Sequence, residues 1–204
     1  MLTIATTPEM PSLVMHAYVE AEMTADEFFE FCQLNRDFRI ERTAEGEIIM
    51  RSPAGGETGN RNAALTAALF VWAKQHGRGV AFDSSTGFIL PNGAMRAPDA
   101  AWVDRSRLQQ LTSEQKRKFL PLCPDFVIEL LSPTDRLQGM QTKMEEYREH
   151  GVQLGWLIDP SERQVFIYRP RHEVVLLPNP ARIMGDPELA GFTLDLTEIW
   201  EPDF

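Results

Sequence analysis

The stretch "DFVIELLSPTDRLQGMQTK", positions 125–143, joins a strand pattern to a helix pattern. Its first part, 125–131, is an apolar run typical of a buried strand, yet Glu129 stands inside it. Because side chains alternate between the two faces of a strand, Glu129 shares a face with Val127 and Leu131. An unpaired ionised carboxylate would be costly there, so we expect Glu129 to contact a cation or to lie near solvent.

A second acid stands in the same kind of place. Asp99 interrupts the small and apolar run "RAPDAAWV", positions 96–103, and Pro98 before it restricts this point to the edge or the end of a strand. If this strand neighbours the one that carries Glu129, the two carboxylates converge. Since like charges repel, a divalent cation such as Mg²⁺ is the partner that this arrangement favours.

The helix expected over about 136–150 supplies a third group. At 100° per residue Met140, Met144 and Tyr147 form one apolar side, and Lys143 lies on its border. If that side packs on the sheet, Lys143 can reach the carboxylates and orient a water or stabilise developing charge. A plain salt bridge between Lys143 and Glu129 is the structural alternative, and it stays open at this point.

Composition bounds the remaining possibilities. The chain has 204 residues and a formal net charge of −10, which argues against a broad surface that coats nucleic acid or an anionic membrane. Its two cysteines, Cys32 and Cys123, predict free thiols rather than a disulfide or zinc framework. The N-terminal region carries neither a basic flank nor a long apolar run, so we expect a cytoplasmic protein without a membrane partner.

Local patterns predict an irregular leader over 1–23 and one domain over 24–204, with an α/β (α+β) mixture of elements. Thr24 is an expected helix N-cap, and Ser132 or Asp135 is expected to cap the helix that follows the key strand. The other expected elements are a hairpin over 38–53, a loop at 55–60, a helix over 61–77, strands near 79–84, 87–91 and 97–104, a polar helix over 105–119, a hairpin over 154–170, and short strands with a last helix near the C-terminus.

Four blocks in this order resemble a large bacterial nuclease family of the PD-(D/E)xK restriction-endonuclease-like superfamily, long known only as a domain of unknown function. The resemblance covers about residues 24–170. The blocks are "RIERTAEGEIIMRSPAGGETGNRN" at 39–62, "FDSSTGFILPNGAMRAPDAAWV" at 82–103, "CPDFVIELLSPTDRLQGMQTKMEEY" at 123–147 and "LGWLIDPSERQVFIYRP" at 154–170.

The resemblance implies a restriction-endonuclease-like core, with a central mixed β-sheet flanked by helices, an N-terminal extension and extra C-terminal β-hairpins. It also implies an endonuclease that depends on Mg²⁺ or Mn²⁺, with Asp99, Glu129 and the backbone carbonyl of Leu130 as metal ligands. The superfamily's usual lysine position is Leu131 here, and the family pattern moves that lysine to Lys143. Glu41 would be a supporting catalytic acid.

The same resemblance implies a nucleic-acid partner, with DNA as the first expectation, and a homodimer. In the sequence, Phe28, Phe29 and Phe31 are the residues expected to supply an apolar surface for that dimer. Many relatives carry a histidine where this chain reads "GETGNRN" at 56–62, so no role is assigned to Glu57 or Asn62. Basic residues expected to contact flanking phosphates are Arg51, Arg61, Lys74 and Arg136.

Two alternatives of other classes remain open. The chain can be a catalytically inactive binding or scaffolding protein that keeps the nuclease fold, a reading that its acidic balance and Leu131 favour. It can also be an enzyme of another class that uses the same acids. Binding of Mn²⁺ separates the first alternative from a nuclease, and phosphodiester model substrates separate the second.

Overall fold

The computed structural model describes residues 23–76 and 78–203. The leader expected over 1–23 therefore lies outside the described residues except for Met23, and so does Gly77, the expected stop of the helix before it. Both cysteines are free thiols, as predicted.

The main sheet has six strands and places Glu129 near its middle. Its order is β10-β9-β8-β7-β6-β3. The central strand β7 runs parallel to β8 and antiparallel to β6, which confirms the expected mixed sheet. The strands are β3 (Gly79–Asp83), β6 (Ala100–Asp104), β7 (Phe126–Leu130), β8 (Leu154–Asp159), β9 (Gln164–Tyr168) and β10 (Val175–Pro178).

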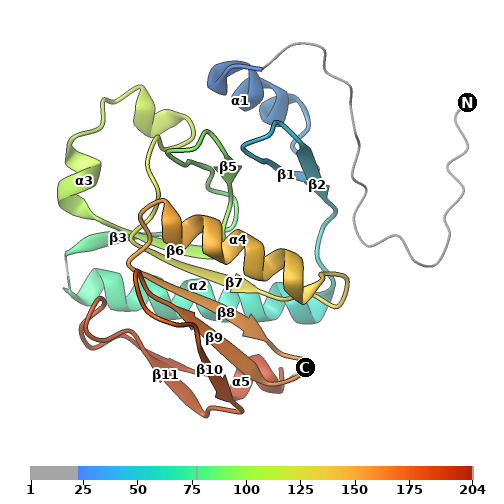
Figure 1. Cartoon of the computed structure of the whole chain (residues 1–204), viewed down its shortest axis with the longest axis vertical. Coiled ribbons are helices and arrows are strands. Elements are labelled where there is room, and N and C mark those ends of the chain that lie inside the picture. Colours follow the sequence, from blue (N-terminus) through green and yellow to red (C-terminus); the bar gives the residue numbers. More distant parts are fainter. Residues whose placement is uncertain (1–22, 77, 204) are drawn as a thin grey trace, which may run out of the picture.

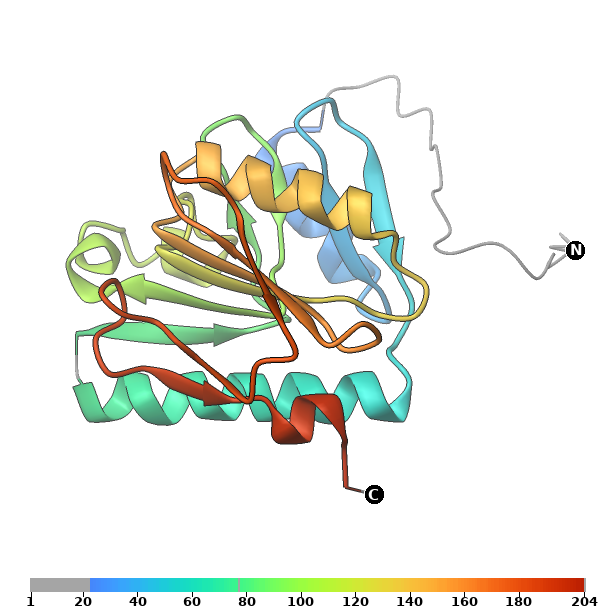
Figure 2. The same cartoon turned by 60° about the horizontal axis from the view of Figure 1, so that its bottom comes forward.

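Two helices cover the two faces of this sheet. Figures 1 and 2 show α2 (Gly56–His76) along one face and α4 (Leu137–Glu149) across the other. The expected core positions of α2, Leu65, Leu69 and Trp72, are buried. The loop expected at 55–60 is wrong, because α2 already begins at Gly56. Glycine is a poor helix former, but the tertiary packing of a long helix outweighs that local preference.

A second, four-stranded sheet lies beside α4 and has the order β2-β1-β5-β4. The expected hairpin is confirmed as β1 (Arg39–Arg42) and β2 (Ile48–Arg51), with Gly46 at a φ of 93° in its turn. The short strands β4 (Phe88–Ile89) and β5 (Met95–Arg96) complete this sheet.

Helix α1 (Ala25–Leu34) packs against the second sheet and begins at a capping box formed by Thr24 and Glu27. Its phenylalanines do not form the apolar surface that we expected. Phe28 is fully buried in the small core of this region, where Phe31 packs against it. The ring of Phe29 lies edge-on against Phe119, 5.2 Å between centroids. These rings hold α1 in place, and the homodimer stays a prediction.

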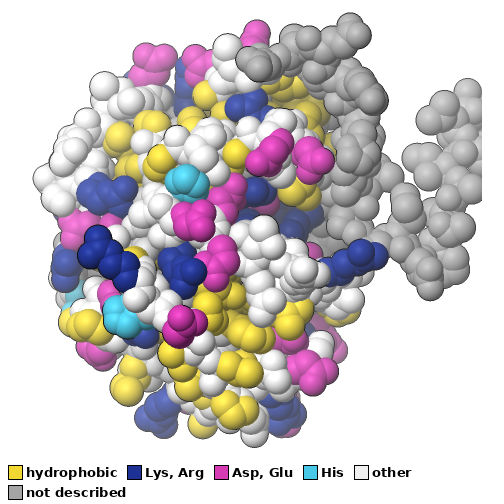
Figure 3. Space-filling model, viewed as in Figure 1, with side chains coloured by type: hydrophobic (Ala, Val, Ile, Leu, Met, Phe, Trp, Pro, Cys, Tyr) yellow, Lys and Arg dark blue, Asp and Glu magenta, His cyan; other side chains and the backbone are white. Residues whose placement is uncertain are grey.

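The remaining elements are short. The polar helix expected over 105–119 is wrong as a continuous element, since only α3 (Arg105–Gln109) and a 3₁₀ turn (Gln115–Arg117) form there. The C-terminal part contains a hairpin of β11 (Arg182–Met184) and β12 (Thr193–Asp195), followed by α5 (Thr197–Trp200). On the face in Figure 3 acidic and basic side chains are interspersed. None of the described helices is long and apolar enough to cross a membrane.

Candidate functional site

Glu129 lies on the face of β7 that α4 covers, and its side chain is completely buried. Its strand neighbour on that face, Val127, packs in the same apolar cluster as Met144 and Tyr147 of α4. The hydroxyl of Tyr147 donates a hydrogen bond to Oε1 of Glu129 at 3.0 Å. The other oxygen, Oε2, is buried and has no hydrogen-bond partner. A carboxylate in this environment needs cations close to it.

Asp99 lies across from Glu129 at the end of β6. The antiparallel register pairs Ala100 with Ile128, and one further step along both strands sets Asp99 opposite Glu129. The backbone N–H of Leu130 donates to Oδ2 of Asp99 at 2.8 Å. The expectation that the two strands are neighbours is therefore met, with Asp99 at a strand end.

Lys143 reaches the carboxylates from α4. Met140, Lys143, Met144 and Tyr147 are the buried residues of this helix, so the lysine belongs to the face that packs on the sheet. Its Nζ atom lies 2.7 Å from Oε1 of Glu129 and 2.7 Å from Oε1 of Glu41. The ammonium thus bridges two buried carboxylates.

Glu41 comes from β1 in the second sheet and is almost fully buried. Besides Lys143, it accepts a hydrogen bond from the backbone N–H of Ala97 at 2.8 Å. Arg96 lies 3.8 Å from its other oxygen and 2.6 Å from Glu146 of α4. Glu41 and Lys143 therefore connect the second sheet, α4 and the end of β7.

The electrostatics of the two glutamates differ although they share Lys143. Burial alone would raise the pKa of Glu41, but Lys143 and three nearby arginines lower it to about 2. For Glu129 burial prevails and raises the pKa, and the negative charges of Asp99 and Glu41 add to this rise while Lys143 opposes it. Of the two glutamates, Glu129 is the one whose surroundings, burial first, disfavour the anion, and its ionisation would benefit from a further cation.

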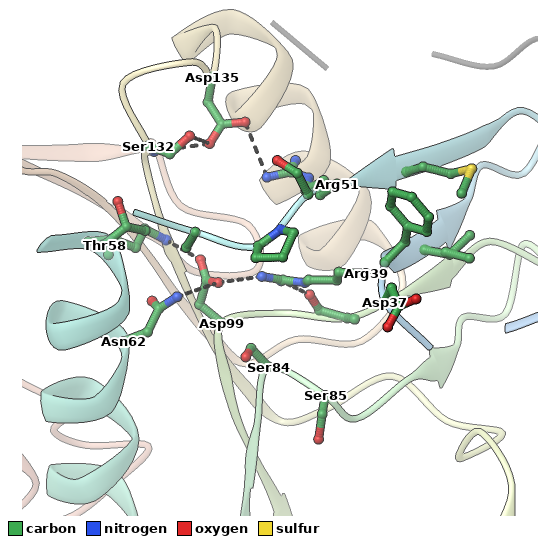
Figure 4. A pocket seen from close by; sticks show the side chains of 18 of the residues that line it. Asp37, Arg39, Arg51, Thr58, Asn62, Ser84, Ser85, Asp99, Ser132 and Asp135 are labelled. Carbon is green, nitrogen blue, oxygen red and sulfur yellow. Dashed lines mark hydrogen bonds and ion pairs between the residues drawn. The ribbon is translucent and has the colours of Figure 1, made fainter. Parts of the chain in front are cut away.

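Arg39 is the site residue that the sequence reasoning missed. Its guanidinium lies 2.6 Å from Oδ1 of Asp99 and donates to the carbonyl of Ala97. Figure 4 shows it approaching Asp99 from one side while Asn62 of α2 approaches from the other, with 3.4 Å between the Asn62 amide nitrogen and Oδ1. Arg39 and Asn62 are the first and last residues of the stretch 39–62 that resembles the nuclease family. Because both are far from Asp99 in the sequence, local patterns could not predict these contacts.

A pocket of about 1050 Å³ opens beside this cluster. The pocket is lined by Asp99, Leu130, Arg39 and Asn62 among others, whereas Glu41, Glu129 and Lys143 are buried and do not line it. Asp99 is therefore the carboxylate through which the pocket adjoins the buried charges. Glu57 also lines the pocket, but its carboxylate pairs with Arg61 on the same helix.

A second polar group in the pocket involves Asp135. It accepts hydrogen bonds from the backbone N–H and the hydroxyl of Ser132, and it pairs with Arg51 at 3.1 Å. The expected capping role is wrong, because the N-cap of α4 is Arg136 and no side chain caps it. Asp135 instead closes the turn before α4 and holds Arg51 at the pocket.

The basic residues expected to contact phosphates do not gather in one place. Arg51 lines the pocket. Arg61 pairs with Glu57 and donates to the carbonyl of Ile199, and Lys74 lies over the Phe70 ring near the other end of α2. Neither of these two, nor Arg136, lines the pocket. Its arginines are Arg36, Arg39, Arg51 and Arg96.

The donor atoms suit a hard divalent cation, although within the described part of the chain no group of three or more histidine, cysteine or acidic side chains has a metal-site arrangement. Asp99 and Glu129 offer carboxylate oxygens from opposite positions on the neighbouring segments of β6 and β7, and the Oε2 atom of Glu129 has no hydrogen-bond partner. Mg²⁺ and Mn²⁺ favour such oxygens, and Mg²⁺ takes few protein ligands and keeps waters. A site with two acids therefore fits this ion.

Comparisons with known proteins agree with this architecture. The family described as "Uma2: Putative restriction endonuclease" matches residues 25–197. Among solved structures, a protein from Anabaena variabilis ATCC 29413, titled "a putative nuclease belonging to DUF820", is similar with a TM-score of 0.70 and 24% identity. The match covers 88% of this chain and 98% of that one, which shows the shared fold. A search of curated proteins found no match.

Proposed function

Because the chain belongs to the Uma2 family, we propose that it is a metal-dependent endonuclease that hydrolyses phosphodiester bonds of nucleic acid, with DNA as the first substrate to test. Asp99 and Glu129 would hold Mg²⁺ or Mn²⁺ together with the backbone carbonyl of Leu130. Lys143 would be the catalytic lysine, and Glu41 would keep it in place. The resemblance supports the metal ligands, and the contacts of Lys143 with Glu129 and Glu41 support the roles of the lysine and of Glu41.

One observation carries the proposal. The ammonium of Lys143 lies 2.7 Å from Glu129, although the position two residues after Glu129 is Leu131 rather than lysine. A buried lysine is expensive unless its charge is used or paired, and here it is delivered from a helix to the carboxylate that faces Asp99. The lysine charge that the superfamily usually places on the strand is therefore supplied here by α4.

The bound cation, Lys143 and Glu41 would each have a separate role in the reaction. When bound, a divalent cation would polarise the scissile phosphate and lower the pKa of a water. Lys143 would hold that water in position or balance the charge that develops on the phosphate. Glu41, which accepts hydrogen bonds from both Lys143 and the N–H of Ala97, would keep the ammonium pointed at Glu129.

Arg39 would change partners during this reaction. Its guanidinium pairs with Asp99, so a cation at Asp99 would compete with it for the same oxygen. Arg39 lines the pocket, and once displaced it would be free to contact a phosphate beside the cleaved bond. The arginine would thus neutralise Asp99 before the cation binds and position substrate afterwards.

The test is cleavage of circular and linear DNA with Mg²⁺ or Mn²⁺ by the wild type and by Asp99→Asn, Glu129→Gln and Lys143→Met. We expect each variant to lose at least about 100-fold in rate. Glu57→Gln is the matched control, since Glu57 is an exposed pocket acid paired with Arg61, and it should retain activity. Undiminished cleavage by purified Glu129→Gln protein would overturn the proposal.

A second candidate function is a non-catalytic binding or scaffolding protein with the same fold. The observation that favours it is that Lys143 and Arg39 already neutralise two charges of the acid cluster without a metal. Calorimetry separates the two functions. Binding of Mn²⁺ that depends on Asp99 supports the nuclease, whereas no binding at millimolar Mn²⁺ supports the scaffold.

A further inference from the structure

Phe38 is an exposed aromatic residue in the wall of the pocket. The residue is 45% exposed, and it directly precedes Arg39 in the chain. Of the phenylalanines in the described part of the chain, Phe38 and Phe70 alone are exposed, and Phe70 does not line the pocket. An exposed aromatic ring in this pocket is a feature that the proposed hydrolysis does not use.

This ring is not part of the hydrophobic core. Among the described residues, none of the three hydrophobic clusters includes Phe38. Phe119, which lines the same pocket, differs, because its ring packs against Phe28 and Phe29 with centroids 6.1 and 5.2 Å apart. Phe38 therefore presents an aromatic surface to whatever enters the pocket.

The charge around the ring suits a phosphate backbone once a cation is bound. Four arginines and four acids line the pocket, so it is less acidic than the chain as a whole, whose net charge is −10. One of the four acids is Asp99, which a divalent cation would more than neutralise. The volume of about 1050 Å³ is at the upper end for pockets that enclose small molecules, which leaves room for a nucleotide.

We propose that Phe38 stacks on an unpaired base next to the phosphate held at Asp99, so that the substrate class is single-stranded nucleic acid or a nucleotide freed from a duplex. This inference rests on the proposed nuclease function. Inside a duplex both faces of a base are covered by its neighbours, and only an unpaired base offers a free face to a protein ring. Arg39, the next residue, would contact the adjoining phosphate.

The experiment compares three ligands on the full chain with Ca²⁺ in place of Mg²⁺, and gels check that the ligands stay intact. They are a thymidine strand of about 12 nucleotides, an abasic strand of the same length and a blunt duplex. Phe38→Trp supplies the signal, since all four natural tryptophans are buried. We expect the thymidine strand to quench its emission and the abasic strand to leave it unchanged.

Affinities of further variants show whether the ring stacks. Phe38→Ala should bind the thymidine strand roughly 5- to 150-fold more weakly and the abasic strand as the wild type does. Phe38→Tyr should bind normally, and Phe38→Leu should resemble Phe38→Ala because its bulk lacks a ring. Phe70→Ala, which removes an equally exposed ring outside the pocket, should change nothing.

Two other outcomes are distinguishable. Equal losses for the thymidine and abasic strands, or duplex bound by the wild type as tightly as the thymidine strand, would overturn this inference and leave the nuclease function standing. A wild-type chain that binds no strand and shows no metal-dependent cleavage would overturn both.

Discussion

The Nζ atom of Lys143 lies 2.7 Å from Oε1 of Glu129, and the two residues come from a helix and a central strand that are packed face to face. A lysine two residues along the strand would project from the same face as Glu129, because side chains alternate. Leu131 occupies that position and packs in the apolar cluster under α4. The helix thus delivers the charge that the strand lacks.

The first prediction concerns this lysine. Lys143→Met should abolish cleavage and also destabilise the fold by about 3–5 kcal/mol, because it leaves Glu41 and Glu129 buried without their shared cation. Cleavage assays and chemical unfolding measure the two effects. A double variant, Leu131→Lys with Lys143→Met, should regain part of the activity. Full activity and stability of Lys143→Met would contradict the role of the lysine.

The second prediction is that replacing Arg39 strengthens Mn²⁺ binding but slows cleavage. Arg39→Gln should bind Mn²⁺ several-fold more tightly in calorimetry, because it removes the cation that pairs with Asp99 at 2.6 Å. It should cleave more slowly, because the proposed phosphate contact is lost. Arg36→Gln removes another pocket arginine, one whose guanidinium donates to the carbonyl of Gln33, and should leave Mn²⁺ binding unchanged. Weaker Mn²⁺ binding by Arg39→Gln would show that the two cations do not compete.

The sequence could predict those site residues that stand out within a single strand or helix. Glu129 is conspicuous because it interrupts an apolar run, and Lys143 because helical spacing puts it beside Met140 and Met144. Their roles as metal ligand and catalytic lysine, which spacing suggested and the family resemblance also implies, stay predictions. The hairpin at Gly46 was also predictable, since glycine accepts the positive φ that this turn requires.

Contacts between distant elements could not be predicted in this way. Arg39 and Asp99 are 60 positions apart, and the strand β5 that helps to bring β1 toward Asp99 is only two residues long. So short a strand has no periodicity to detect. The start of α2 was missed for another reason, because its glycines indicate a loop locally while packing on the sheet decides otherwise.

The third prediction compares two glycines to test how the sheet is packed. A Cβ atom at Gly79 would lie 2.3 Å from the ring of Trp102 and 2.4 Å from the carbonyl oxygen of Val103. Gly79→Ala should therefore destabilise the fold by about 1–3 kcal/mol or more. Gly139, on α4, has open space around it, so Gly139→Ala should stabilise by about 0.5–1 kcal/mol. Urea unfolding of both variants checks this, and equal effects would contradict the packing at β3.

The last prediction uses the lowered pKa of Glu41. A carboxyl whose pKa falls from 4.5 to about 2 on folding stabilises the folded state when it is ionised in both states, that is, above pH 4.5. The contribution is lost as the pH falls from 4.5 toward 2. Its size is on the order of 3 kcal/mol. Unfolding free energies of wild type and Glu41→Gln should therefore differ most above pH 5 and converge in acid.

Glu129 is present in both proteins, and its contribution runs the other way with pH because its pKa shifts upward. Since the Glu41 charge adds to that rise, Glu41→Gln also lowers the pKa of Glu129, and the comparison reports the Glu41 charge together with this effect on its neighbour. Lys143 is the strongest of the charges that lower the pKa of Glu41, ahead of Arg39, Arg51 and Arg96. In a Lys143→Met background the difference between Glu41 and glutamine should therefore shrink, and its pH window should move upward. A difference that is the same with and without Lys143 would mean that the lysine does not stabilise the Glu41 anion, and Glu41 could then not be the residue that holds Lys143 beside Glu129.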